Sequence, residues 1–441
     1  MRARHRARSE RIPLGAAAGE TQVSPCRQES ASPLLVNVLF VAPRIPFPAD
    51  SGGTLRALQL LRALDAAFEV TVLAPDLPGG DADGLRRSVR ARVVAPSEPG
   101  DGPGRAWREA GSLLGGRPFG YGRYAGAGLR GAFRHLLAER SVDVVHFDHL
   151  HAAQLLPEAR AGAPRARVVM DAHNVEAQVA ARLAEVSAWP LRAALRLQAR
   201  AIARLEASRA REVDAVLACS ELDAGALRSL GAREVHLVPN GAELRPLPRA
   251  GAPRDTVVFV GSMDWRPNLD AALLLVREIW PRVRRACPGL RLSLVGRGPP
   301  AELLRLAGAD VEVTGRVDDV GPWLARAFAT LMPLRAGSGT RLKVLEAAAA
   351  RVPIVCTALA SEGLPFRDGE QLLHAETAED FAAALVRLRR EADLAPRLAD
   401  AAWSLAQEFD WRRIGARLVA LYQTWGEAPG AARPPVLSSA G

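Results

Sequence analysis

The chain has 441 residues, 49% of them apolar, and a formal net charge of +10 that arginine carries almost alone. This length favours two domains over one, and the apolar share suffices for packed cores. No apolar run reaches the roughly 18–20 residues that a membrane-spanning helix needs. The four cysteines are scattered without a CxxC pair, so we expect a reducing cytoplasmic setting with neither disulfides nor a thiolate metal site.

The positive charge raises the question of an anionic partner. Acidic residues are interspersed among the arginines, and aromatic residues make up only 5% of the chain. A groove for nucleic acid would combine cations with aromatic stacking platforms, so we expect no nucleic-acid partner. Five arginines stand among the first eleven residues, which hold no apolar segment like that of a signal peptide. Peripheral contact of this segment with an anionic membrane surface, at the inner membrane face, stays open.

The first domain is predicted at residues 35–245, after a tail at 1–34 whose basic and then Ser-, Gly- and Ala-rich composition predicts disorder. Within this domain, short apolar runs alternate with helical stretches such as 54–67 and 191–212. This alternation is typical of a parallel sheet that is buried on both faces. The predicted strands are 36–43, 68–76, 91–96, 142–148, 166–174, 213–220 and 235–241.

The same pattern restarts after a proline-rich link at 244–254, which predicts a second domain at residues 246–409. Its predicted strands are 255–263, 291–298, 311–317, 329–335, 353–357 and 371–375. A helix at 410–425 and a loose tail at 426–441 complete the chain. We therefore expect two doubly wound α/β domains in tandem, with ligands beyond the carboxyl ends of the strands, in a cleft between the domains.

A glycine-rich loop joins a strand to a helix in the segment GSGTRLKVLEAAAA, residues 337–350, which holds Lys343, the only lysine of the chain. Its glycines let backbone N–H groups approach a ligand closely, and Thr340 can cap the helix, whose free N–H groups attract phosphate. Lys343 and Glu346 are three residues apart and share a helix face. A cation for a diphosphate and a carboxylate for a ribose diol together indicate a nucleoside diphosphate.

An exposed Lys–Glu pair worth only ~0.3–0.5 kcal/mol is the structural alternative. Such a pair would work equally well with arginine, which this chain uses everywhere else. A compact ammonium fits against phosphate oxygens where the planar guanidinium fits poorly, so we favour the binding role. The pattern GxxxxGK[ST] is absent, and ATP hydrolysis is therefore not indicated.

These residues resemble the donor-site segment of glycosyltransferase family 4, whose members have the GT-B fold. Further motifs carry the resemblance over residues 36–425: PFPADSGGTLRA, DVVHFDHLH, VPNG, FVGSMDWRPNLDA, LVGRGP and VTGRVDDV. The form GSMDWRPN is most similar to bacterial sugar transferases of exopolysaccharide pathways. The resemblance implies two Rossmann-like domains that face a cleft, and a last helix that crosses back onto the first domain.

The resemblance also implies a retaining transferase of the hexosyl type that uses a nucleoside diphosphate sugar, with neither cofactor nor metal. Glu346 would hold the ribose hydroxyls, and the amides of Gly339 and Thr340 would hold the diphosphate together with Lys343. Many family members have a second glutamate where this chain has Ser338, so a hydroxyl and backbone amides would replace its contact with the donor sugar. The first domain would bind a glycan or lipid-linked acceptor.

A second departure concerns the charges after the first glycine of the second domain. The arginine and lysine that bind phosphate in the family fall on Ser262 and Pro267 here. Arg266 is adjacent and is our main candidate for the missing charge. Arg341 and Arg297 are lesser candidates.

Three of the eight histidines lie in HFDHLH, residues 146–151. A cluster this dense could bind a metal ion with Asp148 as a further ligand, but no further His or Cys is spaced for a closed site. We expect His146, which still lies on the strand, to be a core histidine with a backbone hydrogen bond. By resemblance, His151 contacts the donor sugar and helps to organise the reacting centre, with His149 as the alternative.

The ends of two other strands of the first domain offer further ligand contacts. His173 and Asn174 follow a strand, where contact with the acceptor is plausible. Gly52 and Gly53 lie between the first strand and its helix. They make either a simple turn or a close backbone approach to the donor diphosphate.

We expect Lys343 and Arg266 to stabilise the charge that develops on the leaving diphosphate. No pair of carboxylates flanking the bond is evident, so we expect same-face attack assisted by the leaving phosphate. The acceptor would belong to exopolysaccharide or cell-surface glycan synthesis. Two alternatives stay open: a sugar-nucleotide epimerase, and a non-catalytic scaffold that binds nucleotide sugars in a polysaccharide assembly.

Overall fold

The computed structural model of the protein describes residues 36–97, 118–244, 254–337 and 342–426. The predicted tail at 1–34, most of the tail at 426–441, and four candidate site residues lie outside these ranges. Those four residues are Ser338, Gly339, Thr340 and the lesser candidate Arg341.

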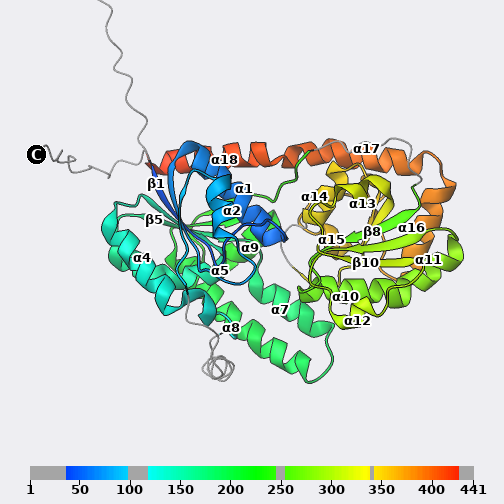
Figure 1. Ribbon diagram of the computed structural model, residues 1–441, viewed down its shortest axis with the longest axis horizontal. Coiled ribbons are helices and arrows are strands. Elements are labelled where there is room, and N and C mark those ends of the chain that lie inside the picture. Colours follow the sequence, from blue (N-terminus) through cyan, green and yellow to red (C-terminus); the bar gives the residue numbers. More distant parts are fainter. Residues whose placement is uncertain (1–35, 98–117, 245–253, 338–341, 427–441) are drawn as a thin grey trace, which may run out of the picture. The chain divides into compact units, whose positions relative to one another are not determined.

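The first sheet has seven parallel strands in the order β3-β2-β1-β4-β5-β6-β7 (Figure 1). Its strands are β1 (Asn37–Val41), β2 (Glu69–Leu73), β3 (Arg92–Val94), β4 (Val144–Asp148), β5 (Arg167–Ala172), β6 (Ala215–Ala218) and β7 (Val235–Leu237). Each lies inside a predicted run. The runs were predicted too long at their carboxyl ends because residues such as Pro43 have no N–H to continue a ladder.

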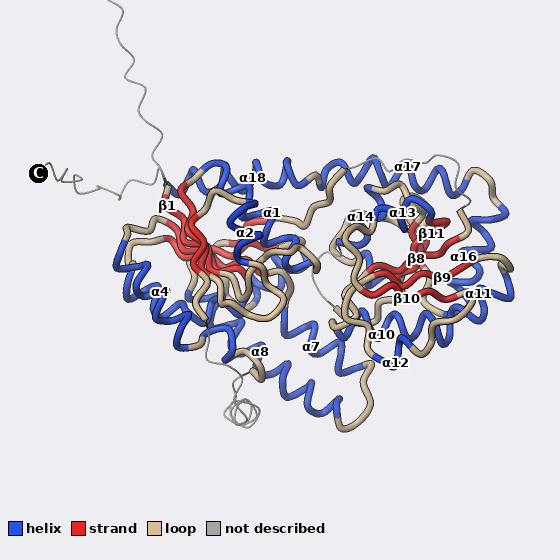
Figure 2. Tube along the Cα trace, viewed as in Figure 1, coloured by secondary structure: helices blue, strands red, loops and turns tan. Residues whose placement is uncertain are grey.

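The second sheet has six parallel strands in the order β10-β9-β8-β11-β12-β13. They are β8 (Thr256–Val260), β9 (Arg291–Val295), β10 (Val311–Gly315), β11 (Ala327–Met332), β12 (Ile354–Cys356) and β13 (Leu373–His374). Figure 2 shows the two separate groups of strands, each with helices around it. The predicted fold class, two doubly wound parallel-sheet domains, is confirmed.

Helices connect the strands of each sheet. In the first domain these are α1 (Gly52–Ala67), α2 (Ala82–Ser88), α4 (Ala127–Glu139), α5 (His149–Ala152), α6 (Leu156–Gly162), α7 (Glu176–Glu185), α8 (Leu191–Glu212) and α9 (Glu221–Ser229). In the second domain they are α10 (Arg266–Leu274), α11 (Trp280–Ala286), α12 (Ala301–Leu304), α13 (Gly321–Arg326), α14 (Leu342–Ala349), α15 (Ala358–Ser361), α16 (Ala378–Arg390) and α17 (Leu394–Ala406), followed by α18 (Trp411–Gly426). Short 3-10 turns lie at Gly122–Ala125, Ala153–Leu155 and Gln407–Phe409, and a π-helical turn lies at Leu275–Ile279.

Strand β1 shows why the first sheet is buried on both faces. Its successive side chains point to opposite faces, so Val38 and Phe40 enter one apolar core while Leu39 and Val41 enter the other. Helix α1 covers the first of these faces. It begins at a capping box between Ser51 and Thr54, which satisfies two backbone N–H groups.

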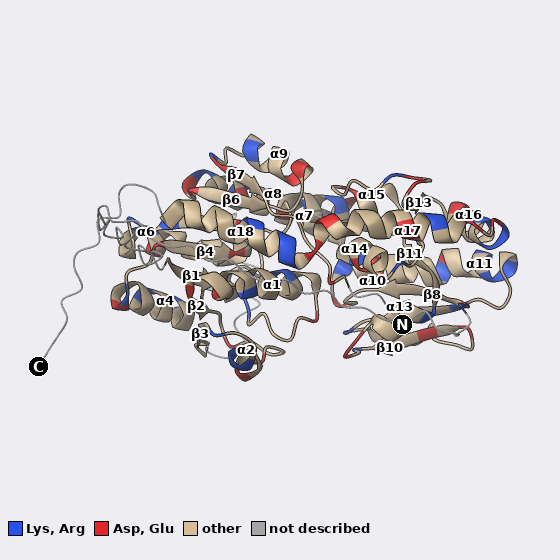
Figure 3. Cartoon of the chain, turned by 90° about the horizontal axis from the view of Figure 1, so that it is seen from above, with Lys and Arg blue, Asp and Glu red and all other residues tan. Residues whose placement is uncertain are grey.

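Helix α18 covers the same face of the first sheet, although it follows the second domain in the chain. Its buried residues Ile414, Leu418 and Tyr422 belong to the apolar core of β1 and α1. Gly415 allows the close approach to α1, since a methyl group there would lie 2.8 Å from Cβ of Ala63. Figure 1 and Figure 3 show α18 beside α1. The predicted crossing of the last helix to the first domain is confirmed.

Charges of both signs are interspersed over the helices, as Figure 3 shows. Within the described ranges, no helix combines the length and the apolar character that crossing a bilayer would require.

Candidate functional site

A buried ion pair lies at the carboxyl ends of β4 and β5. The guanidinium of Arg56, on α1, donates to both carboxylate oxygens of Asp171 over 2.6 and 2.9 Å. Its remaining nitrogen donates to the Pro239 carbonyl and to Oδ1 of Asn240, in the VPNG motif. Burial alone would raise the pKa of Asp171, but the charges of Arg56 and His173 lower it well below its usual range. Arg56 therefore fixes α1, β5 and the VPNG loop at one point.

His173 lies between two carboxylates just after β5. Its Nε2 is 2.7 Å from Oδ1 of Asp148, the last residue of β4, and 3.2 Å from Oδ2 of Asp171. Burial alone would lower the pKa of His173, but the two carboxylates outweigh burial and raise it to about 9. With Arg56, the group contains two cations and two anions, so its charges balance inside the protein.

His149 packs against the His173 ring, with ring centroids 3.6 Å apart. It begins α5 with a φ of +73°, a left-handed conformation that non-glycine residues adopt at a cost of about 1–3 kcal/mol. Burial, together with the charge of His173, lowers the pKa of His149 well below its usual range. A neutral imidazole thus lies directly on a charged one.

Gly53 lies beside this histidine pair, at the start of α1. A methyl group at Gly53 would be 3.4 Å from Nε2 of His149 and 3.7 Å from Nδ1 of His173, and no atom of His151 would come within 4 Å of it. His151 instead stacks on Tyr121, with ring centroids 4.1 Å apart. The structure therefore brings together Gly53, His149 and His173 from three separate motifs, and leaves His151 in an aromatic cluster.

Asn174, the other residue predicted after β5, donates from Nδ2 to Oε1 of Glu176 over 3.2 Å. Oε1 of Glu176 also lies 3.7 Å from Nδ1 of His149. Asn174 thus belongs to the same polar cluster as the histidine pair, and its amide helps to orient Glu176.

His146 is buried, as predicted, but its partner is not the backbone. Nδ1 is hydrogen bonded to the Tyr422 hydroxyl at 2.6 Å, and the ring stacks on Phe40 with centroids 4.4 Å apart. The expected backbone hydrogen bond was wrong, since a side chain 276 residues away in sequence occupies that position. Burial lowers the pKa of His146 to about 4.

One atom each from His146, Asp148 and Asp171 lie within 4.8 Å of one another, which a metal ion could use. Both carboxylates already bind cations, Arg56 and His173. A divalent ion bound to these carboxylates would be repelled by the two positive charges that they already hold. We assign no metal to this group.

In the second domain, the side chain of Lys343 packs against Phe259, a residue of β8. Its ammonium is 4.6 Å from the centroid of the Phe259 ring and donates to Oδ1 of Asn268 over 2.5 Å. Asn268, a buried residue of α10, also donates from Nδ2 to the Ser262 carbonyl over 3.0 Å. The loop after β8 and the lone lysine are thus held by one amide side chain.

Glu346 follows one turn after Lys343 on α14, partly buried. Burial raises the pKa of Glu346, and the charge of Lys343 opposes this rise. The predicted cation and carboxylate on one helix face are present. Arg266, the first residue of α10, is exposed. Arg297 faces Asp264 at 3.2 Å and Asp50 at 3.6 Å, so acidic side chains already neutralise it in part.

Contacts join the loops at the carboxyl ends of the two sheets. A methyl group at Gly52 would lie 3.0 Å from Cδ1 of Leu342, the first residue of α14. Arg182, on α7, donates to the Gly337 carbonyl over 2.7 Å and to both carboxylate oxygens of Glu362. Gly52 of the first domain therefore lies beside α14 of the second, while Gly53 lies beside the histidine pair.

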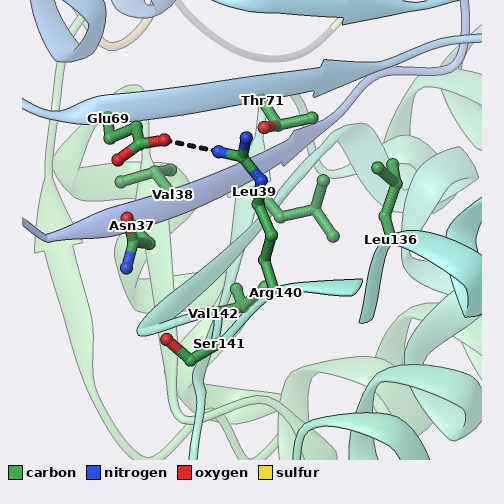
Figure 4. A pocket seen from close by; sticks show the side chains of 9 residues that line it. All are labelled: Asn37, Val38, Leu39, Glu69, Thr71, Leu136, Arg140, Ser141 and Val142. Atoms are coloured by element: carbon green, nitrogen blue, oxygen red, sulfur yellow. Dashed lines mark hydrogen bonds and ion pairs between the residues drawn. The ribbon is translucent and has the colours of Figure 1, made fainter. Parts of the chain in front are cut away.

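A small pocket lies elsewhere, near the amino ends of β1 and β2 (Figure 4). The ion pair of Arg140 with Glu69 crosses it. Ligands of parallel α/β sheets bind at the opposite, carboxyl edge, and this pocket carries none of the predicted site residues.

Sequence reasoning missed Arg56, Asp171 and Asn268. The signals were present: Arg56 and Asn268 lie inside the motifs SGGTLRA and DWRPN, and Asp171 interrupts an apolar strand. A charged residue in a strand that is buried on both faces requires a partner. The sequence did not indicate which residue that partner would be.

Known proteins are similar to this chain in both domains. The family model "Glycosyltransferase Family 4" matches residues 51–245, and the model "Glycosyl transferases group 1" matches residues 254–391. Phosphatidyl-myo-inositol mannosyltransferase of Mycobacterium leprae is 31% identical over 211 residues, 45% of this chain and 55% of that protein. The protein of the same name from Mycolicibacterium smegmatis is 28% identical over 45% of this chain and 54% of that protein. The chain thus spans about half the length of these curated relatives.

Solved structures share the fold at low sequence identity. Sucrose-phosphate synthase from Thermosynechococcus elongatus superposes with a TM-score of 0.66 at 19% identity, over 88% of this chain and 98% of that chain. HepE from Anabaena, solved with UDP and glucose, gives a TM-score of 0.65 at 14% identity, over 88% of this chain and 100% of that chain. The two family models match one domain each, and the chain belongs to the family 4 glycosyltransferases with the GT-B fold.

Proposed function

We propose that the protein transfers a hexosyl group, with retention of configuration, from a nucleoside diphosphate sugar to a lipid-linked or polysaccharide acceptor. The observation that carries this proposal is the pair of Lys343 and Glu346 on one face of α14, beyond the carboxyl ends of the second sheet. HepE, which has the same fold, was solved with UDP-glucose. That complex supports a nucleotide sugar as the donor.

The donor contacts follow from charge and geometry. The ammonium of Lys343 is held by Asn268, so it can face diphosphate oxygens without the loss of side-chain entropy that a free lysine would suffer. Glu346, one turn further, can accept two hydrogen bonds from a ribose diol. Arg266 begins α10, where a cation is unfavourable beside the free N–H groups. A bound diphosphate would reverse that repulsion.

Retention by two protein carboxylates requires them to flank the glycosidic bond about 5–5.5 Å apart, one as nucleophile and one as acid and base. Asp148 and Asp171 are close together, since both contact His173, but they are buried and neutralised by Arg56 and His173. They act as supports rather than nucleophiles. We therefore favour same-face attack, in which the leaving phosphate accepts the acceptor proton while Lys343 and Arg266 stabilise its charge.

The first domain contributes the histidine pair to this proposal. His149 is neutral and lies next to Gly53, so its Nε2 is placed to meet a sugar hydroxyl. His173 lies behind it as a cation that two carboxylates hold in position. We assign the sugar contact to His149, with His151 as the lesser candidate and His173 and Asn174 toward the acceptor.

The acceptor class rests on the relatives and on the sequence resemblance. Two relatives are named phosphatidyl-myo-inositol mannosyltransferases, which supports a lipid-linked acceptor. The motif GSMDWRPN favours exopolysaccharide or cell-surface glycan synthesis at the cytoplasmic side of the membrane. Neither observation names the sugar.

The test is transfer of radiolabel from nucleoside diphosphate sugars to membrane-lipid and glycan acceptors. Transfer should be lost in Lys343→Met and Glu346→Gln. The matched control is the exposed Arg–Glu pair of α16, Arg387 and Glu391, 2.8 Å apart. Its variants Arg387→Met and Glu391→Gln should keep transfer. UDP, GDP and ADP should be ranked beforehand by the rise in melting temperature, because a ligand that binds only the folded state stabilises it.

Other outcomes select the alternatives. Nucleotide-sugar binding without transfer across a broad acceptor panel would indicate the scaffold. Conversion of the sugar with release of free sugar, and with no need for an acceptor, would indicate an epimerase. Equal transfer by wild type and Glu346→Gln would refute the donor site as proposed.

A further inference from the structure

Helices α7 and α8 form an antiparallel hairpin in the first domain and lie side by side in Figure 1. The carboxylate of Glu206, on α8, accepts hydrogen bonds from the first backbone N–H groups of α7, at Glu176 and Ala177. Gln198, on α8, exchanges two hydrogen bonds with the backbone of Phe119. These contacts fix the rotation of α8 about its axis, so its exposed face is defined.

That exposed face is a ridge of arginine. Arg192, Arg196, Arg200 and Arg204 recur every four residues and are all exposed. Residues four apart differ by about 40° around a helix axis, so the four side chains cover about a third of its circumference. The ridge is about 18 Å long. It lies opposite the buried residues Ala201, Ile202 and Glu206.

No acidic residue balances this ridge locally. Residues 186–205 contain four arginines and neither aspartate nor glutamate. The adjacent carboxylate in α7 is Glu185, before the turn. Within the part of the chain that the structure describes, Arg196, Arg200 and Arg204 form no ion pair, and Arg192 donates to the Ser187 carbonyl over 2.8 Å. Elsewhere many exposed arginines are paired with carboxylates, as in Arg277–Glu302 and Arg387–Glu391.

Large apolar side chains lie next to the ridge. Trp189, in the turn that precedes α8, is 82% exposed, and Leu197, one residue after Arg196, is 42% exposed. Tryptophan at the boundary between water and lipid, with arginines reaching phosphates beside it, is the combination that favours membrane interfaces.

We infer that the α7–α8 hairpin docks on an anionic phospholipid surface through a docking face of Trp189, Arg192, Arg196, Arg200 and Arg204. The indole enters the headgroup layer, and the guanidinium groups bind lipid phosphates. The surface is complementary in charge because the face carries four positive charges and no negative one. This inference goes beyond the proposed function and does not depend on it.

The experiment is co-sedimentation of the full-length protein, without nucleotide, with vesicles of phosphatidylcholine alone or mixed with phosphatidylglycerol. Binding should require phosphatidylglycerol and fall with added salt, because exposed charges are screened. Each arginine near such a surface changes binding about fivefold. The triple variant should therefore bind on the order of 100-fold more weakly. The triple variant is Arg196→Gln, Arg200→Gln and Arg204→Gln.

A matched triple variant removes the same charge from exposed positions in the second domain. Its substitutions are Arg285→Gln, Arg305→Gln and Arg326→Gln. This control should bind vesicles like the wild type, and all variants should keep the wild-type melting temperature because the changed side chains are exposed. Loss of binding in the control as well would mean that net charge, not this face, controls adsorption, and would overturn the inference.

Trp189 supplies an independent readout. The chain has eight tryptophans, so the difference between wild type and Trp189→Ser isolates one of them. The wild type should show a blue shift of fluorescence on addition of phosphatidylglycerol vesicles, and Trp189→Ser should show little. Three results would overturn the inference: no vesicle binding by the wild type, undiminished binding by the arginine triple variant, or a dimer that Trp189→Ser dissociates while vesicles have no effect.

Discussion

The hydroxyl of Tyr422 lies 2.6 Å from Nδ1 of His146, so the final helix α18 is hydrogen bonded to strand β4 inside the first domain. Both residues are fully buried. Two residues further along β4 comes Asp148, which holds His173. The position of α18 is thereby coupled to the strand that supports the histidine pair.

We expect Tyr422→Phe to lower the free energy of unfolding by about 1–3 kcal/mol, because the variant leaves a buried imidazole nitrogen without a partner. Nε2 of His146 already has no hydrogen-bond partner among the described residues. Denaturant titration measures the change. Gln423→Ala, an exposed change on the same helix, should stay within about 0.5 kcal/mol. Equal stability of Tyr422→Phe and wild type would show that the hydrogen bond contributes nothing net.

Arg56→Met should destabilise the protein by about 3–5 kcal/mol, because it leaves the Asp171 carboxylate buried without its main cation. The double variant Arg56→Met with Asp171→Asn should recover part of this loss. Arg277, whose pair with Glu302 is half exposed at 2.6 Å, offers the control. Arg277→Met should cost less than about 1 kcal/mol. A double variant as unstable as Arg56→Met would contradict the ion-pair account.

The free energy of unfolding should depend on pH in two ranges, one above and one below pH 6.5. His173 has a pKa of about 9 against its ordinary 6.5, so its contribution is complete below pH 6.5 and disappears as the pH rises toward 9. His146 has a pKa of about 4, so the cost of keeping it neutral grows as the pH falls from 6.5 toward 4. In the variant His173→Gln, the free energy of unfolding measured by denaturant titration should change little with pH above 6.5. If the free energy of unfolding of that variant still fell above pH 6.5 as it does in the wild type, His173 would be excluded as the source of the fall.

Gly53→Ala should keep or slightly raise stability and yet lower transferase activity. The added methyl would contact His149 and His173 at ordinary distances, 3.4 and 3.7 Å, while alanine gains about 0.5 kcal/mol over glycine in a helix. The same methyl would cover the histidine pair from the donor side. Thermal unfolding and kcat/KM should therefore change in opposite directions. Gly131→Ala in α4, with open space around the site, should leave activity intact.

Asn268→Ala should weaken nucleotide binding about tenfold, because Lys343 and the Ser262 carbonyl both lose the amide that fixes them. The dissociation constant is measured by calorimetric titration. The ligand is the nucleoside diphosphate that stabilises the wild type most. Asp270→Ala, on the same helix but paired outward with Arg335, is the comparison. If Asp270→Ala also weakened nucleotide binding tenfold, the effect would come from α10 as a whole and not from the Asn268 amide.

The strands were predictable from sequence because most are short, largely apolar runs that end in a turn, as in residues 215–218. The covering helices 54–67 and 191–212 followed from their length and spacing. The placement of Lys343 and Glu346 on one helix face could be predicted because a helical spacing of three residues is a local property. Its loop at residues 338–341 lies outside the described ranges, so its predicted contacts stay predictions.

The pairings inside the first domain could not be predicted. Arg56 and Asp171 are 115 residues apart, and His146 and Tyr422 are 276 apart, and no periodicity links such positions. The choice between His149 and His151 depended on the rotation of the short helix α5. In the structure His149 has a left-handed conformation and its ring lies beside Gly53, while the His151 ring stacks on Tyr121.

Because α18 completes the core around β1 and α1, the second domain is topologically an insertion between the strands of the first domain and its last helix. A ribosome makes the whole second domain before residues 411–426 emerge. The part of the first domain's apolar core that α18 covers therefore stays open until the second domain has been made, although α1 is already available to cover the rest.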